Sequence, residues 1–317
     1  MDKNNDVVIL GEDILDPYGG AFKVTSGLST RFPDRVFTTP ISESAITGIA
    51  AGLAMRGLRP IVEIMFGDFV TLCADQLING AAKFRWMFND AVRVPMVVRT
   101  PMGGRRGYGP THSQCLEKIF LGVPGMWVIA PNILGRPGNL LKQAVDCNDP
   151  VLFIENKTCY SRYVVDSVPE MTSEIYHDNT APFATQYLRH QTEASDGLLF
   201  CYGGMVPHCL EAIEHLRQEE GLHIDMIIFT QLSPTPVAHM QHFMEKWPTE
   251  KCFYVEETNT SGGFSSEMIA TVEDISTTNI CHKKTGGANT PVPSSKTLES
   301  QALPQKEDII KMILDAF

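Results

Sequence analysis

The run VFTTPISESAITGIAAGLAMRGLRPIVEIM, residues 36–65, decides the fold of this chain. It begins with a short apolar segment at Val36–Thr38. Apolar residues then recur at helical spacing over Ser42–Arg56, and Gly57 ends this pattern. A second apolar segment follows at Pro60–Met65. A strand, a helix and a strand in direct succession are typical of parallel strands joined by a crossover helix.

The same alternation extends in both directions along the chain. Further strands are expected at Val7–Leu10, Val94–Arg99, Trp127–Ala130 and Val151–Glu155, and helices at Ala21–Phe32, Phe69–Phe88 and Leu134–Val145. A second series is expected to have strands at Gly197–Cys201, Ile224–Phe229 and Lys251–Glu256, and helices at Pro207–Glu220, Pro236–Lys246, Ser265–Val272 and Lys306–Phe317. Between the two series, residues 158–194 are mixed and polar. The sequence therefore predicts an α/β fold of two domains, 1–157 and 195–317, each a mostly parallel sheet with helices on both faces, joined by a linker at 158–194.

Composition excludes several classes of function. The 317 residues carry 26 basic and 37 acidic side chains, for a net charge of −11, which disfavours nucleic acid and anionic membranes as partners. No apolar run reaches the length of a membrane span, and the first six residues are polar and lack a signal-peptide core. The eight cysteines occur singly without a CxxC pair, as expected for buried thiols of a cytoplasmic protein rather than metal ligands.

Two segments carry candidate chemistry. Glu43 lies in the first turn of the helix expected at Ser42–Arg56, where a carboxylate is favoured either for a function or simply as a helix start with Ser42 as cap. Residues 103–110 form a glycine-rich loop after a strand, in which Arg105 and Arg106 could meet an anion. The alternative is a flexible surface loop. His112 follows it and is the best candidate for a general acid or base.

Five aromatic residues cluster around the helix expected at Phe69–Phe88. They are Phe66, Phe69, Phe84, Trp86 and Phe88. On spacing alone they are core residues. The sequence contains neither a GxxxxGK[ST] phosphate loop nor the GxSxG or HExxH motifs of hydrolases, and no other metal-ligand spacing.

The motifs together resemble a known family. TPISESAITGI (residues 39–49), GLRPIVEIMFGDF (57–69) and GPTHSQ (109–114) are similar to the beta subunit of the decarboxylating component of 2-oxo acid dehydrogenase complexes, a relative of transketolase. Weaker matches, among them LSP (232–234) and GGF (262–264), extend the resemblance over almost the whole chain. The family depends on thiamine diphosphate.

The resemblance implies roles for individual residues. Glu43 matches the glutamate that hydrogen-bonds the cofactor's aminopyrimidine, and Phe69 matches the aromatic residue that stacks on that ring. His112 matches the histidine that faces the substrate and the acyl acceptor, and Glu12 matches an acid near the inter-subunit interface. The backbone carbonyls of Ala144, Cys147 and Asp149 match a potassium-binding loop of some members.

The resemblance also implies partners. The segment that holds magnesium and diphosphate in thiamine-diphosphate enzymes, Gly-Asp-Gly followed by an Asn pair, is missing, so an alpha subunit is expected to supply it within an α2β2 heterotetramer. The expected donor is a 2-oxo acid such as pyruvate, and the expected acceptor is the lipoyl group of an acyltransferase. Two alternatives stay open: transfer of a two-carbon unit from a ketose phosphate to a carrier-protein thiol, and a non-catalytic scaffold subunit.

Overall fold

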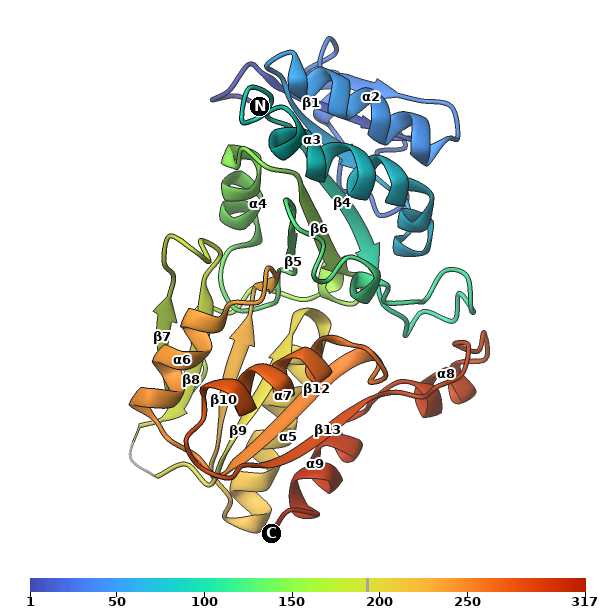
Figure 1. Ribbon diagram of the computed structural model, residues 1–317. Coiled ribbons are helices and arrows are strands. Elements are labelled where there is room, and N and C mark those ends of the chain that lie inside the picture. The colour runs from blue at the N-terminus through green and yellow to red at the C-terminus, as the bar shows by residue number, and fades with distance from the viewer. Residues whose placement is uncertain (192–193) are drawn as a thin grey trace.

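Two β-sheets occupy the two halves of the molecule in the computed structural model, which describes residues 1–191 and 194–317 (Figure 1). The sheet of the first half has seven strands in the order β11 (Gln231–Ser233), β5 (Trp127–Ile129), β6 (Val151–Asn156), β4 (Val97–Met102), β3 (Arg59–Glu63), β1 (Val7–Gly11) and β2 (Val36–Thr38). All are parallel except β11, which comes from the second half of the sequence and runs antiparallel to β5.

The second sheet has six strands and is parallel at its centre. Their order is β13 (Cys281–Gly287), β12 (Lys251–Asn259), β9 (Gly197–Tyr202), β10 (Ile224–Phe229), β8 (Thr185–His190) and β7 (Met171–Tyr176). The first four strands in this order are parallel, whereas β8 and β7 run antiparallel to their neighbours. Both sheets are thus mostly parallel, as expected.

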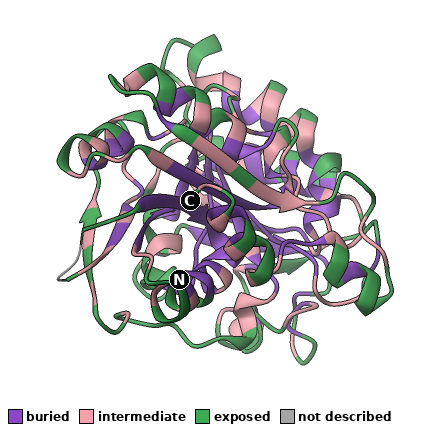
Figure 2. Cartoon of the chain, turned by 90° about the horizontal axis from the view of Figure 1, so that it is seen from below, coloured by how far each residue is buried: buried purple, intermediate pink, exposed green. Residues whose placement is uncertain are grey.

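Helices cover the faces of both sheets. In the first half they are α1 (Leu28–Arg31), α2 (Glu43–Met55), the 3₁₀ helix η1 (Gly67–Cys73), the π-helix η2 (Gln76–Ala81), α3 (Ala82–Met87), η3 (Glu117–Ile119), α4 (Pro137–Asp146) and η4 (Cys159–Ser161). In the second half they are η5 (Gly203–Met205), α5 (Val206–His215), η6 (Leu216–Glu220), α6 (Val237–Lys246), α7 (Phe264–Ile275), α8 (Lys296–Ala302) and α9 (Lys306–Leu314). Because helices shield both faces, the central strands are buried almost throughout (Figure 2).

The expected linker contains structure. Strands β7 and β8 form a hairpin that pairs with β10, so the expectation of a linker at 158–194 is wrong for residues 171–176 and 185–190, while residues 192–193 lie outside the described part. The composition looked irregular because β7 is an edge strand with mostly exposed polar side chains. In β8, Tyr187 is buried and stacks on Phe243 and Trp247 of the second half.

Other elements also differ from expectation. The long helix expected at Phe69–Phe88 is divided into η1, η2 and α3, and only Leu28–Arg31 of the helix expected at Ala21–Phe32 forms. At the start of η1, a Cβ on Gly67 would lie 2.2 Å from the Met102 side chain, so the backbone passes directly against β4 there. Strand β13 and helix α8 were not expected, because their sequences are polar or rich in glycine and serine.

Candidate active site

The expected site residues lie beyond the carboxyl ends of parallel strands in the first sheet. Glu12 directly follows β1, and Glu43 begins α2 after β2. Phe69 lies in η1 after β3, and His112 lies in the long loop after β4. Because parallel strands end at the same edge, the topology brings these segments together where α/β sheets commonly bind ligands.

Most of the Glu43 residue is buried, but its carboxylate oxygens stay open to the surface and have no hydrogen-bond partner among the described residues. The side chain is 7% exposed, and within residues 1–191 and 194–317 neither of its carboxylate oxygens accepts a hydrogen bond. The backbone carbonyl of Glu43 accepts from Thr47 Oγ1 at 2.8 Å and from Cys73 Sγ at 3.7 Å, which ties the start of α2 to η1. Ser42 makes no capping hydrogen bond. A simple helix start therefore does not account for this buried acid.

Glu12 lies beside Glu43 and is also buried, at 8% exposure. Burial and then the nearby Glu43 charge raise the pKa of Glu12, although a hydrogen bond from the Ser42 backbone lowers it. Among the described residues, Glu12 Oε1 has no hydrogen-bond partner. A buried carboxyl oxygen without a partner, such as Glu12 Oε1, is costly unless a donor from a ligand or another chain satisfies it.

His112 is packed among aromatic rings. Its ring centroid lies 4.8 Å from that of Phe66 and 5.2 Å from that of Phe69, both edge to face. Thr111 Oγ1 lies 3.0 Å from His112 Nδ1, so Nε2 is the nitrogen left for a substrate. The structure thus brings Phe69 and His112 into contact, and η1 connects them to the start of α2.

Two buried charged groups hold the His112 loop. Lys157 Nζ donates to the carbonyl of His112 at 2.6 Å, and burial lowers the pKa of this lysine. Asp68 Oδ1 accepts from Gln114 Nε2 at 2.8 Å and from the Gln114 backbone at 3.3 Å. Sequence reasoning missed both residues, although Asp68 stands next to Phe69 in the GDF segment.

The arginines of the glycine-rich loop do not face a ligand. Arg105 Nη2 donates to the carbonyl of Pro304 at 2.6 Å, and its Nη1 donates to Gln305 Oε1 at 3.1 Å. Arg106 Nη2 donates to the carbonyl of Lys157 at 2.9 Å. The expectation that these arginines meet an anion is wrong, because their guanidinium groups fasten the loop to other parts of the chain.

Sequence comparison identifies relatives of known class. Residues 1–162 match the pyrimidine binding domain of transketolase, and residues 186–309 match the transketolase C-terminal domain. The chain is 35% identical over 314 residues to the pyruvate dehydrogenase E1 component subunit beta-1 of Arabidopsis thaliana, covering 98% of this chain and 84% of that protein. It is 34% identical over 329 aligned positions to the beta subunit of acetoin:2,6-dichlorophenolindophenol oxidoreductase of Bacillus subtilis, covering 99% and 92%.

The chain belongs to this family of E1 beta subunits. A solved structure described as "Split gene transketolase, inactive beta4 tetramer" superposes with a TM-score of 0.74 over 99% of this chain and 93% of that one. At 19% identity, that likeness concerns the fold alone.

The loop expected to bind potassium accepts hydrogen bonds from an arginine side chain of the same chain, Arg59. Arg59 Nη1 donates to the carbonyls of Val145 at 2.6 Å and Cys147 at 2.9 Å. The carbonyl of Ala144 accepts the backbone N–H of Cys147, and the Asp149 carboxylate binds Arg85. The Arg59 guanidinium thus bonds one of the three carbonyls expected to bind potassium, that of Cys147, and the potassium site stays a prediction.

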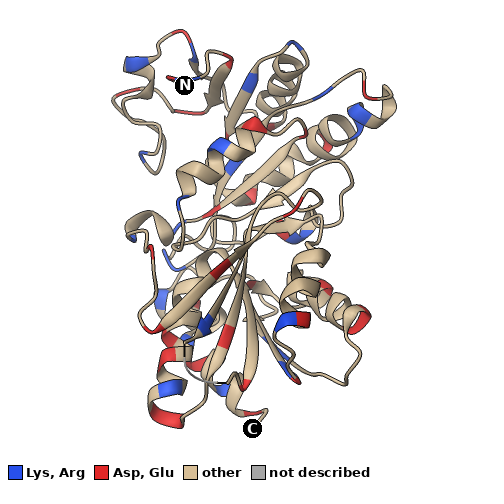
Figure 3. Ribbon diagram, turned by 90° about the vertical axis from the view of Figure 1, so that its left-hand side faces the viewer, with Lys and Arg blue, Asp and Glu red and all other residues tan. Residues whose placement is uncertain are grey.

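The described ranges contain neither a metal-binding cluster nor a membrane-spanning helix. Within 1–191 and 194–317, no group of three or more His, Cys, Asp or Glu side chains is arranged to hold a metal ion. No helix in these ranges is both long and apolar enough to cross a membrane. Basic and acidic residues alternate over both halves (Figure 3).

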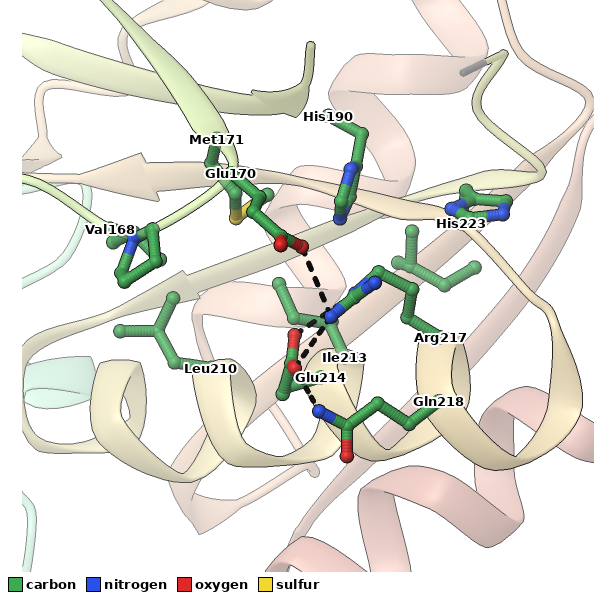
Figure 4. A pocket seen from close by; sticks show the side chains of 12 residues that line it. Val168, Glu170, Met171, His190, Leu210, Ile213, Glu214, Arg217, Gln218 and His223 are labelled. Atoms are coloured by element: carbon green, nitrogen blue, oxygen red, sulfur yellow. Dashed lines mark hydrogen bonds and ion pairs between the residues drawn. The ribbon is translucent and has the colours of Figure 1, made fainter. Parts of the chain in front are cut away.

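A separate pocket of about 430 Å³ lies at the amino end of β10 in the second half (Figure 4). Arg217 crosses it and binds Glu214 at 2.8 Å and Glu170 at 3.1 Å. His190 and His223 form part of its wall. Because two carboxylates neutralise the arginine, the pocket does not offer a free cation to an anionic ligand, and it contains none of the expected site residues.

Proposed function

We propose that this chain is the beta subunit of a thiamine-diphosphate-dependent 2-oxo acid dehydrogenase and is active only with an alpha subunit. The observation that carries the proposal is the Glu43 carboxylate, which is open to the surface, accepts no hydrogen bond within the described residues and begins the helix beside η1, where Phe69 contacts His112. A carboxylate in this state is suited to a cationic or N–H-bearing ring that the protein itself does not supply. The relationship to pyruvate dehydrogenase E1 beta subunits supports the same reading.

Each residue then has a distinct task. Glu43 accepts a hydrogen bond from the aminopyrimidine of the cofactor, and Phe69 packs against that ring. Glu12 lies close enough to Glu43 for the Glu43 charge to raise the pKa of Glu12. When bound, thiamine diphosphate supplies a nucleophilic carbon and an electron sink for decarboxylation. His112 Nε2 holds or delivers the proton needed when the acyl group passes to its acceptor.

The alpha subunit supplies what this chain lacks. Large apolar side chains are exposed around the start of α2: Ile41 at 84%, Ile49 at 55% and Leu72 at 55%. Exposed apolar surface beside a buried, unsatisfied acid is typical of a surface that another chain covers. We propose that the covering chain is the alpha subunit, that the two form an α2β2 heterotetramer, and that the alpha subunit holds the magnesium ion and the diphosphate.

The acyl acceptor in this proposal is the lipoyl group of an acyltransferase. The donor is a 2-oxo acid, since the relatives include pyruvate dehydrogenase subunits. All eight cysteines are free, which suits the reducing cytoplasm. A ketose-phosphate donor and a scaffold role remain as outcomes of the experiment below.

The test uses the chain purified with its alpha partner, thiamine diphosphate and magnesium. Wild type should release carbon dioxide from pyruvate. Glu43→Gln should lower turnover by about 10²-fold or more, because it removes the charged acceptor, while leaving the complex assembled. The exposed Glu211→Gln is the matched control and should keep full activity.

The three readings give different results. Carbon dioxide release that depends on Glu43 supports the dehydrogenase. Cleavage of a ketose phosphate with acylation of a carrier-protein thiol would favour the transfer enzyme, and the absence of both activities would favour the scaffold. In addition, calorimetry of the chain without its alpha partner should detect no tight binding of thiamine diphosphate. Stoichiometric tight binding would refute the requirement for a second polypeptide.

A further inference from the structure

Two buried carboxylates from the second half enter the glycine-rich loop that precedes His112. Glu299 of α8 accepts the backbone N–H groups of Arg105 through Oε1 at 2.9 Å and of Gly107 through Oε2 at 2.8 Å. Glu257 of β12 accepts the N–H of Gly104 through Oε1 at 2.8 Å. Both side chains are nearly inaccessible, at 2% and 5% exposure.

The loop backbone is shaped to bind an anion. Gly103, Arg105 and Gly107 have positive φ values of 92°, 68° and 73°, which turn neighbouring N–H groups toward a common point. Such a concave set of N–H groups usually receives phosphate or another anion from solution. Here the anion belongs to the protein. The N–H groups of Gly104, Arg105 and Gly107 are therefore already bonded and are not available to a substrate phosphate.

The first residues of the loop also pack directly against the second half of the chain. A Cβ on Gly104 would lie 2.5 Å from Leu303, so the backbone directly contacts the segment that follows α8. The Arg105 guanidinium reaches Pro304, and Glu257 Oε2 also accepts from Asn156 Nδ2 at 2.7 Å. The second half of the chain thus contacts the loop at consecutive residues, Gly104 and Arg105.

We propose that Glu299 is a positioning residue for His112. The carboxylate fixes residues 105–107, and the loop leads within a few residues to the His112 ring between Phe66 and Phe69. Glu257 fixes the preceding residue, Gly104. The hydrogen bonds of Glu257 and Glu299 to the N–H groups of Gly104, Arg105 and Gly107 are called the clamp below. This inference rests on the proposed function for its catalytic consequence, but the clamp itself is a physical contact that is measurable without any reaction.

Amide hydrogen exchange at single-residue resolution tests the clamp in the complex with the alpha partner. Glu299→Gln leaves one acceptor oxygen where two are needed and adds an N–H₂ group facing a donor. Exchange at Arg105 and Gly107 should accelerate about 10-fold or more, the usual value of a hydrogen bond to a charged group. Glu257→Gln should accelerate exchange at Gly104 instead. Glu307 is exposed, and Glu307→Gln is the control: it should leave the exchange rates of Gly104, Arg105 and Gly107 unchanged.

The position of His112 is followed by its reaction with diethyl pyrocarbonate, measured on the His112 peptide by mass spectrometry. Glu299→Gln should change this rate several-fold, since the ring is no longer held between the two phenylalanines. Turnover of the complex on pyruvate should fall through kcat, with KM nearly unchanged, because the substrate contacts remain.

Each result decides the inference. Faster exchange at Arg105 and Gly107, together with an altered His112 reaction rate and a lower kcat, supports it. Unchanged exchange in Glu299→Gln overturns the clamp, and unchanged His112 reactivity or kcat despite faster exchange overturns the positioning role. If the wild-type complex has no activity on a 2-oxo acid, the proposed function fails, while exchange and His112 reactivity still decide the role of Glu299.

Discussion

Arg99 is a buried cation between two acids of neighbouring strands. It lies on β4 at 4% exposure, and its guanidinium donates to Glu63 of β3 and Glu155 of β6, with Tyr160 Oη a further partner at 3.1 Å. Burial disfavours the charged guanidinium, but Glu155 and Glu63 outweigh this and raise the pKa of Arg99. Burial also raises the pKa of Glu63. The group is stable only as a unit, since each charge offsets the desolvation of the others.

Removing the cation should therefore destabilise the first half. Arg99→Met keeps the apolar stem but leaves the buried Glu63 carboxylate unpaired and Glu155 with only Tyr160 as partner, and we expect a loss of about 3–5 kcal/mol in the free energy of unfolding. Urea denaturation followed by fluorescence measures this loss. The exposed pair of Arg93 with Asp90 provides the control, because Arg93→Met should cost less than about 1 kcal/mol. Equal losses for the two variants would contradict the role of burial.

Helix α3 shows how far spacing misleads about burial. Trp86 was expected in the core, but it is 90% exposed, and Phe88, just after the helix, is 49% exposed. Phe66 and Phe69 serve the His112 site, while Phe84 is half-buried against the core. The helix turns its tryptophan outward because η1 and η2 shift the phase of the helical repeat before α3 begins.

Trp86→Ala should accordingly change the stability of the chain by less than about 0.5 kcal/mol. Phe120, which is fully buried, is the contrasting position: Phe120→Ala should cost about 3–5 kcal/mol because it leaves a cavity. Thermal unfolding of both variants beside wild type distinguishes the two sites. A large loss in Trp86→Ala would mean that the ring is covered by protein.

Strand β12 carries an acid whose protonation couples stability to pH. Glu256 is 0% exposed, and burial raises its pKa to about 7, although Ser265 at the start of α7 donates to it. In the unfolded chain the pKa returns to about 4.5. Between these values the folded protein holds a proton that the unfolded chain releases, so stability falls as pH rises from about 4.5 to about 7.

Glu256→Gln should remove this dependence. Relative to wild type, the variant should gain stability between pH 5 and pH 8, by an amount on the order of 3 kcal/mol. Urea unfolding at several pH values measures the difference, with the exposed Glu250→Gln as control. If the difference between Glu256→Gln and wild type is the same at every pH, the carboxyl group is not buried as described.

The two halves of the molecule share structural elements. Strand β11 of the second half forms the edge of the first sheet beside β5, and one apolar core cluster contains residues of both halves, such as Val128 and Phe229. Glu257 and Glu299 add polar contacts across the same boundary. The two halves therefore form one structural unit. The loop that leads to His112 in the first half is held in place by contacts from the second half.

A fragment of residues 1–162 should consequently be unstable by itself. It would lose β11, expose the edge of β5 and leave the glycine-rich loop without its two carboxylates. We expect it to aggregate or to unfold at a markedly lower temperature than the full chain. Size-exclusion chromatography and thermal unfolding, with the fragment alone and coexpressed with residues 163–317, check this. If the fragment is monomeric and unfolds at the same temperature as the full chain, the first half does not need the second half for its stability.

The local patterns of the sequence determined much of this protein. Periodic apolar residues predicted the central strands and α2, because burial in a parallel sheet requires continuous apolar segments whatever the surroundings. The TPISE, GDF and HSQ segments indicated the family, and the family resemblance marked Glu43, Phe69 and His112. Sequence comparison confirmed the family, whereas the roles of these three residues stay predictions until tested.

Tertiary structure alone decided which groups satisfy one another. Glu257 lies 153 positions after Gly104 and Glu299 lies 194 positions after Arg105, so no local pattern reveals these contacts. The same holds for Arg59, whose guanidinium bonds the carbonyl of Cys147, one of the three expected to bind potassium, and that of Val145. The hairpin of β7 and β8 also depends on long-range pairing with β10. Hydrogen bonds between distant segments form only once the sheets have folded. The spacing of residues along the chain therefore cannot predict them.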